Sequence, residues 1–255
     1  MMTTKIRNRP DNQKGICSMI KTVYFDIDNT LYNFNDSDQH AMEAMCDYCK
    51  EHFQMDHDRA MRELKEAKAY VSKALPDRPA MHNRVLRYQR FLEKNKLSLF
   101  PHTINMANHY WQSLIDSVVV EPGISELMKA IKDKGCKIGI GTNMTSYVQF
   151  LKLDKLKLAE YIDFIVTSEE ADHEKPSEEF FDLVIKKAGG VPDEIVFIGD
   201  NLELDALGSS KCGMHGVLYL PPYLKEPAVT PENGIIRNYS DCITEDGIKL
   251  GNLML

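Results

Sequence analysis

Two aspartates, Asp26 and Asp28, stand two positions apart directly after the apolar run 23–25, which is typical of a buried β-strand. Side chains at this spacing can project to the same side of an extended segment, so their carboxylates repel each other unless a cation or a shared proton intervenes. Asp200, after the apolar run 195–198, offers a third carboxylate at another predicted strand end. Such oxygen ligands favour a hard cation, and Mg²⁺ commonly meets both carboxylates and a substrate phosphate. The sequence therefore predicts a magnesium cofactor and a phosphorylated substrate together.

The groups that surround a phosphate occur at other places in the chain. Phosphoryl transfer requires fixed positive charge and hydrogen-bond donors, which Lys175, the hydroxyl of Thr142 and backbone N–H groups near Asn143 can supply. Each residue alone has an ordinary explanation, because an aspartate at a strand end often caps the next helix. Their order along the chain, with Asp205 shortly after Asp200, and their setting at strand ends favour one common site.

Short apolar runs alternate with amphipathic helical patterns, which favours an α/β fold with a parallel sheet covered on both faces. The interval from Thr30 to Thr142 is more than three times the roughly 30 residues of an ordinary βαβ unit, and its patterns are helical. We therefore predict a Rossmann-like, doubly wound core formed by residues 19–34 and 119–255, with residues 35–118 as an inserted all-helical domain. Residues 1–18 are polar and aperiodic, which predicts a disordered tail.

The charge balance restricts the class of partner. The 255 residues include 31 Lys and Arg against 38 Asp and Glu, a formal charge of −7, which gives no electrostatic reason to bind a nucleic-acid polymer or an anionic membrane. No apolar run approaches the roughly 20 residues of a membrane helix, and no secretory signal is present, so we expect a cytoplasmic protein with a small-molecule partner.

Six cysteines are scattered along the chain, and we expect them to be reduced thiols. Cys46 and Cys49 have the spacing of a metal-binding pair, and His52 follows. A zinc site needs a fourth ligand, which is not apparent, and the pair fits the buried face of a helix. We interpret it as core packing.

The strand-end segments resemble the four motifs of the haloacid dehalogenase-like hydrolase superfamily, over about residues 20 to 220. Residues 23–32 resemble the first motif, 141–143 the second, Lys175-Pro176 the third and 198–208 the fourth. The resemblance implies a Rossmann-like core, and the inserted helices resemble the cap that closes over the phosphate in one class of this superfamily. Asp28 favours the phosphatase branch, since the dehalogenases lack this second aspartate and need no metal.

The same resemblance implies a role for each residue. Asp26 is then the nucleophile that becomes a phospho-aspartate, and Asp28 the acid and base that protonates the leaving group and activates water. Mg²⁺ is held by Asp26, the backbone carbonyl of Asp28, and Asp200. Thr142 and Asn143 then bind the phosphate, Lys175 neutralises the charge of the nucleophile and phosphate, and Asp205 orients metal-bound water or Lys175.

Substrate specificity is expected in the cap. The side chains that can face the crevice are Asn33, Phe34, Arg84, Arg87, Tyr88, Tyr110 and Trp111. We interpret Trp111 as cap core and the two arginines as a solvated face. The chain departs from the common family pattern at Met144, where many members carry glycine, and at 173–174, where many have a glycine shortly before the lysine; we expect His173 to be a bystander.

The function that these features favour is hydrolysis of a small phosphate ester, a nucleoside monophosphate or a sugar phosphate. The first motif is similar to that of pyrimidine 5'-nucleotidases, and the layout is similar to that of sugar-phosphate phosphatases. One alternative is a phosphomutase, which uses the same aspartyl chemistry. Two others are a phospho-accepting signalling module and a binding protein that retains the fold without catalysis.

Overall fold

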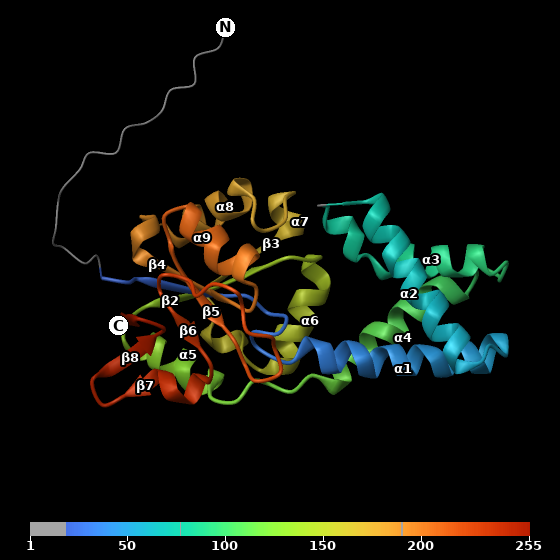
Figure 1. Cartoon of the computed structure of the whole chain (residues 1–255), viewed down its shortest axis with the longest axis horizontal. Coiled ribbons are helices and arrows are strands. Elements are labelled where there is room, and N and C mark those ends of the chain that lie inside the picture. Colours follow the sequence, from blue (N-terminus) through green and yellow to red (C-terminus); the bar gives the residue numbers. More distant parts are fainter. Residues whose placement is uncertain (1–18, 77, 190) are drawn as a thin grey trace, which may run out of the picture.

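A parallel six-stranded sheet forms the centre of the molecule (Figure 1). The structure is a computed structural model, and it describes residues 19–76, 78–189 and 191–255; the predicted tail, 1–18, lies outside them. The strand order is β3-β2-β1-β4-β5-β6, and every pair is parallel. The strands are β1 (Thr22–Phe25), β2 (Lys137–Thr142), β3 (Phe164–Thr167), β4 (Ile195–Gly199), β5 (His215–Tyr219) and β6 (Ile235–Ile236). The predicted α/β class with a doubly wound parallel sheet is confirmed.

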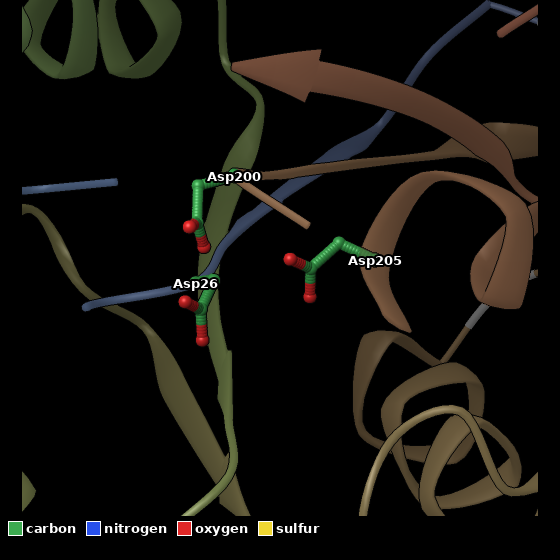
Figure 2. Close-up of side chains that lie close together, drawn as sticks. All are labelled: Asp26, Asp200 and Asp205. Atoms are coloured by element: carbon green, nitrogen blue, oxygen red, sulfur yellow. The ribbon is translucent and has the colours of Figure 1, made fainter. Parts of the chain in front are cut away.

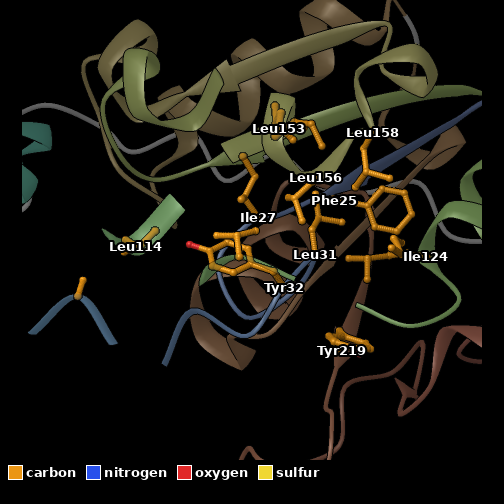
Figure 3. Close-up of a cluster of buried hydrophobic side chains, with 14 of the residues drawn as sticks. Phe25, Ile27, Leu31, Tyr32, Leu114, Ile124, Leu153, Leu156, Leu158 and Tyr219 are labelled. Atoms are coloured by element: carbon orange, nitrogen blue, oxygen red, sulfur yellow. The ribbon is translucent and has the colours of Figure 1, made fainter. Parts of the chain in front are cut away.

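Helices cover both faces of the sheet, because alternate strand residues point to opposite sides. Val23 and Phe25 of β1 pack with α5 (Ile124–Asp133) and α6 (Ser146–Leu156), whereas Tyr24 packs with α8 (Glu178–Ala188). Figure 3 shows the first of these clusters, in which Phe25 lies near Ile124 and Leu158. Both faces of β1 are thus apolar, which fixes the strand whose carboxyl end carries Asp26.

Two glycines in β2 make room for aromatic rings on the α8 side. A Cβ atom at Gly139 would lie 2.4 Å from the Tyr24 ring, and one at Gly141 would lie 2.6 Å from the Phe197 ring. The rings of Tyr24 and Phe197 stack with centroids 6.0 Å apart. The two glycines therefore leave space for these rings, while β1, β2 and β4 lie in register with their carboxyl ends at one edge of the sheet.

Between β1 and α5 the described residues form four α-helices, and we refer to residues 34–117 as the cap. They are α1 (Phe34–Phe53), α2 (His57–Ala74), α3 (Arg84–Lys94) and α4 (His102–Ser117), with the 3₁₀ turn η1 (Pro79–His82). Side chains cap three of these helices: Asn33 caps α1, Asp56 caps α2 and Asn83 caps α3. In Figure 1 the cap lies to one side of the sheet, beside α6. The domain boundaries at 34/35 and 118/119 stay a prediction.

The remaining elements complete the core around the sheet. They are η2 (Ala159–Tyr161), α7 (Ser168–Ala171), η3 (Pro192–Glu194), the π-helical turn η4 (Leu202–Ala206), α9 (Leu207–Lys211), η5 (Tyr239–Cys242), β7 (Ile243–Thr244), β8 (Gly247–Leu250) and β9 (Leu253–Met254). Strands β7, β8 and β9 form a small antiparallel sheet. Ile248 and Leu250 of β8 join the core cluster that contains α5, so this C-terminal segment packs under one face of the main sheet.

Two further observations bear on the sequence analysis. Cys46 and Cys49 are buried in the apolar core on α1, together with Ala41 and Met45. Within the described ranges, every helix is too short or too polar to cross a membrane.

Candidate active site

The carboxyl ends of β1, β2 and β4 meet at one edge of the sheet. Phe25 is in register with Ile140 of β2 and with Ile198 of β4, and the Asp26 N–H donates to the Ile198 carbonyl at 2.8 Å. Asp26, Thr142 and Asp200 therefore leave the sheet side by side, as expected for parallel strands. Functional side chains from distant parts of the sequence are brought together here.

Three carboxylates cluster at this edge. Oxygen atoms of Asp26, Asp200 and Asp205 lie within 4.8 Å of one another, and Figure 2 shows the three side chains turned toward a common centre. Asp205 comes from η4 and accepts a hydrogen bond from the Asn201 N–H at 3.0 Å. A Cβ atom at Gly199 would lie 2.3 Å from the Asp205 carboxyl carbon, so the glycine of the Gly-Asp motif lets Asp205 approach the strand end.

Lys175 is the cation of this cluster. Its Nζ donates to Asp26 Oδ1 and Asp205 Oδ1, each at 2.7 Å, and to the Gly141 carbonyl at 3.0 Å. Its side chain is only 3% exposed, so both ion pairs are shielded from water. The Asn143 side chain accepts from the Lys175 N–H at 2.8 Å, which holds the lysine loop against the end of β2. Asn143 thus positions Lys175 in this structure.

The carboxylates carry more negative charge than Lys175 neutralises. Burial raises the pKa of Asp26 to about 6, against the opposing effect of Lys175. Burial also raises the pKa of Asp200 to about 8, and the neighbouring Asp205 and Asp26 raise it further. Three crowded carboxylates offer only oxygen donors, a set that suits a small hard divalent cation such as Mg²⁺.

The Asp28 side chain pairs with groups outside the cluster of three carboxylates. Its Oδ1 accepts from the Tyr32 hydroxyl at 2.6 Å and from Lys152 Nζ at 2.7 Å. Its side chain is not one of the three that cluster, and the predicted role of Asp28 at the metal concerns its backbone carbonyl. Asp28 and Lys152 form a further ion pair, in addition to the two that Lys175 makes.

Lys152 is a site residue that the sequence analysis missed. It lies on α6 with a fully buried side chain, and its Nζ is 5.5 to 5.8 Å from the ring centroids of Tyr32, Phe34 and Trp111. The available signal was its spacing, since it stands four residues after Val148 and four before Leu156, on the buried stripe of the helix. A lysine on such a stripe requires a counter-charge.

The loop after β2 explains one departure from the family pattern. Met144 has φ 140°, a backbone conformation that glycine adopts more readily than other residues, and its N–H donates to Ser168 Oγ at 2.9 Å. The loop thus keeps a glycine-like shape without the glycine. The hydroxyl of Thr142 accepts from the buried side-chain amide of Gln149 at 2.7 Å, a second contact that the sequence analysis missed.

A pocket of about 400 Å³ joins this edge of the sheet to the cap. Its lining includes Asp26, Asp28, Thr142, Asn143, Lys175, Asp200 and Asp205 from the core, and Phe34, Lys68, His82, Arg84 and Arg87 from the cap side. A larger cavity of about 550 Å³ lies elsewhere, between α6 and β3, and contains none of these residues. The smaller pocket is the candidate active site, because the clustered charges are there.

The interpretation of Arg84 and Arg87 as a solvated face is wrong. The two arginines are only 4% and 7% exposed. Arg84 donates to the His82 carbonyl and the Tyr110 hydroxyl, and Arg87 donates to the Met81 carbonyl. The guanidinium of Arg84 also lies 4.5 Å from the ring centroids of Tyr110 and Trp111. Helical periodicity alone does not show that η1 folds back over this face of α3.

The other residues proposed to face the crevice have structural positions. Asn33 caps α1, Tyr88 and Tyr110 are buried in the cap, and Trp111 packs partly buried against the core cluster. His173 is exposed and bonds to the Ala171 carbonyl. Its neighbour Glu174 instead lies with Oε1 2.8 Å from Nε2 of His82, a contact between the cap and the loop that carries Lys175.

Comparison with known proteins identifies the family. A model described as haloacid dehalogenase-like hydrolase matches residues 20–213. The chain belongs to this hydrolase family. It is 30% identical to ribulose-1,5-bisphosphate 5-phosphatase of Halopiger xanaduensis, over 80% of this chain and 86% of the relative. It is also 30% identical to pyrimidine 5'-nucleotidase YjjG of Escherichia coli, over 75% of this chain and 82% of the relative.

A solved structure agrees with this assignment at the level of the fold. The HAD phosphatase from Thermococcus onnurineus superposes with a TM-score of 0.66 at 24% identity, over 87% of this chain and 95% of that chain. The resemblance to the superfamily and the prediction that the chain is a hydrolase are confirmed.

Proposed function

We propose that this hydrolase is a Mg²⁺-dependent phosphomonoesterase that cleaves a small phosphorylated metabolite, a nucleoside monophosphate or a sugar phosphate, through a phospho-aspartate on Asp26. The observation that carries the proposal is the ammonium of Lys175, 2.7 Å from both Asp26 and Asp205, with Asp200 beside them in a pocket. The two relatives named above are a sugar bisphosphate phosphatase and a nucleotidase, which supports this substrate class.

The carboxylates of Asp26 and Asp200 and the backbone carbonyl of Asp28 are the proposed ligands of Mg²⁺. Asp205 lies close enough to orient water on the ion while it also holds Lys175. When bound, Mg²⁺ supplies charge neutralisation for the carboxylates and the phosphate and acts as a Lewis acid toward a phosphate oxygen.

In the first step a carboxylate oxygen of Asp26 attacks the phosphorus. The bond between phosphorus and the ester oxygen breaks as the new bond forms, and Asp28 gives its proton to the departing oxygen. Lys175 offsets the charge repulsion between the carboxylate and the phosphate, and backbone N–H groups near Thr142 and Asn143 bind the phosphate oxygens. Asp28 has to turn from Lys152 toward the leaving group to act in this way.

In the second step water attacks the same phosphorus. Asp28 takes a proton from that water, the bond between Asp26 and phosphorus breaks, and inorganic phosphate leaves. Asp28 then carries the proton needed for the next cycle. A phosphomutase would return the phosphoryl group to a sugar at this point, so product analysis with a hexose 1-phosphate separates the two functions.

Removal of divalent metal is expected to abolish turnover. Purified protein with 4-nitrophenyl phosphate and Mg²⁺ should release phosphate, and excess EDTA should lower the rate by at least about a hundredfold, because the crowded carboxylates then repel the substrate. Added excess Mg²⁺ should restore the rate, and Ca²⁺, with its longer bonds, should not. Undiminished turnover after exhaustive chelation would contradict a metal-dependent mechanism.

Replacement of Lys152 by methionine is expected to impair the acid role of Asp28. The variant removes the buried ammonium that pairs with Asp28 when this carboxylate is ionised between proton transfers, so kcat/KM for an alkyl phosphate should fall about tenfold to a hundredfold. The loss with 4-nitrophenyl phosphate should be smaller, because its leaving group needs no proton. Lys155→Met, an exposed change on the same helix, is the matched control. Equal losses on both esters would argue against a positioning role for Lys152.

A further inference from the structure

The cap side of the pocket carries a cluster of positive charge. It consists of Lys68 on α2 and Arg84 and Arg87 on α3, and all three line the pocket. Asp38 lies 3.6 Å from Lys68 and accepts a hydrogen bond from Tyr110, and among the described residues it is the one carboxylate in an ion pair with any of the three. Three cations beside one carboxylate leave an excess of two positive charges.

Resting on the function proposed above, we propose that this cluster binds a second phosphate, carried by the leaving group, so that the preferred substrate is a small bisphosphate ester. The excess of two positive charges matches a phosphate dianion. Guanidinium groups are the usual partners of phosphate oxygens, because their N–H groups form pairs of parallel hydrogen bonds.

Arg87 has more donors than acceptors. The Met81 carbonyl, at 2.9 Å, is the one acceptor that the described part of the chain provides for its guanidinium, which has five N–H groups. The Nε atoms of Arg84 and Arg87 are buried without a hydrogen-bond partner among the described residues. Buried charged donors without acceptors are costly, so an anionic ligand in the adjoining pocket would stabilise this arrangement.

The three cations also repel one another. Burial lowers the pKa of Arg87 to about 10, and the nearby Arg84 contributes. Burial, with Arg84 and Arg87 as further causes, lowers the pKa of Lys68 against the opposing effect of Asp38. Arg84 differs, because burial lowers its pKa but Tyr110, Tyr88 and Asp38 together raise it above its usual value. The positive charges of Arg87 and Lys68 are therefore the ones that their surroundings do not offset.

The cap cluster is separate from the charges at the sheet edge. The carboxylates there pair with Lys175 and Lys152, and across residues 19–76, 78–189 and 191–255 no ion pair joins them to the three cap cations. Glu174, which also lines the pocket, lies 2.8 Å from His82, which offsets its charge when the imidazole is protonated. One pocket of about 400 Å³ thus has a phosphate site at each side, which suits an ester with a phosphate at both ends.

The test compares three esters of one carbon chain in the presence of Mg²⁺. They are pentane-1,5-diol monophosphate, pentane-1,5-diol bisphosphate, and the monophosphate whose far end is a carboxylate. We expect kcat/KM for the bisphosphate to exceed that for the monophosphate about tenfold to a hundredfold, with the carboxylate compound between them.

Two variants assign the preference to the cap. Arg87→Gln should reduce the ratio of kcat/KM between bisphosphate and monophosphate about tenfold. Lys68→Gln should reduce the same ratio less, and because Lys68 is half-exposed this change is safe for the fold. Arg90→Gln removes the same charge from α3 outside the pocket, where its guanidinium lies 4.0 Å from the Tyr70 ring centroid, and should leave the ratio unchanged.

Three results would overturn the inference, and each differs from failure of the proposed function. A wild-type enzyme that prefers the monophosphate, or treats the two alike, has no second phosphate site. Equal losses on both esters in Arg87→Gln would place the arginine at the scissile phosphate. A carboxylate compound as good as the bisphosphate would exclude recognition of phosphate. If no ester, including 4-nitrophenyl phosphate, is hydrolysed, the proposed function itself is wrong.

Discussion

Asp26→Asn is expected to lower kcat/KM for every phosphate ester by at least about a thousandfold, because a carboxamide is too weak a nucleophile to form the phospho-enzyme. The change keeps the shape of the side chain and removes its charge. Acid-quenched wild-type protein should yield a phosphorylated peptide that contains Asp26, whereas the variant should yield none. Phosphate release and mass spectrometry measure the two effects.

The same variant should fold as well as the wild type. Burial raises the pKa of Asp26 to about 6, so its negative charge is unfavourable in the metal-free protein, and a neutral amide relieves repulsion with Asp205. The midpoint of thermal unfolding should therefore be unchanged or higher. Asp182→Asn, an exposed change on α8, should retain full activity as the matched control. Turnover above about a tenth of the wild-type rate in Asp26→Asn would rule out Asp26 as the nucleophile.

Lys175→Met should impair both catalysis and stability. The ammonium touches Asp26, Asp205 and the Gly141 carbonyl, so its loss removes the fixed positive charge nearest the nucleophile, and kcat/KM should fall about a hundredfold to a thousandfold. Two buried carboxylates are left without their partner, so the free energy of unfolding near pH 7 should fall by about 3 kcal/mol or more. Urea unfolding and ester hydrolysis measure the two quantities.

Lys186→Met is the control for charge removal. Lys186 is exposed on α8, so its loss should change stability by less than about 0.5 kcal/mol and leave activity intact. Lys175→Arg should fail to restore activity, since a guanidinium is too large for a position that is 3% exposed and holds three acceptors. Wild-type activity in Lys175→Met would contradict the proposed mechanism.

The sequence was sufficient for the features that depend on local pattern. Apolar runs that end at or just before Asp26, Thr142 and Asp200 identified three strand ends. Because a parallel sheet places the carboxyl ends of its strands at one edge, the runs also predicted that these side chains lie close together. The long helical interval between the first two strands and the four motifs identified the fold class and the hydrolase family, both of which are confirmed.

What periodicity could not supply was the set of contacts between elements distant in the chain. In the sequence, nothing distinguishes Lys152 from other lysines on a helix. Its role as the buried partner of Asp28 follows from the packing of α6 against Tyr32 and Trp111. Arg84 and Arg87 read as a solvated face, and only the fold of η1 over α3 buries them beside the pocket.

The physical reason is that burial and electrostatic environment are properties of the assembled molecule. A strand or a helix can be recognised from the pattern of neighbouring residues, and the residue that follows it is read directly from the sequence. The charge that a side chain meets depends on which other segments pack against it, and that is decided only when the sheet edge and the cap come together. Local sequence pattern was therefore enough to indicate the kind of chemistry, whereas the packing of the cap on the core placed Lys68, Arg84 and Arg87 beside the pocket.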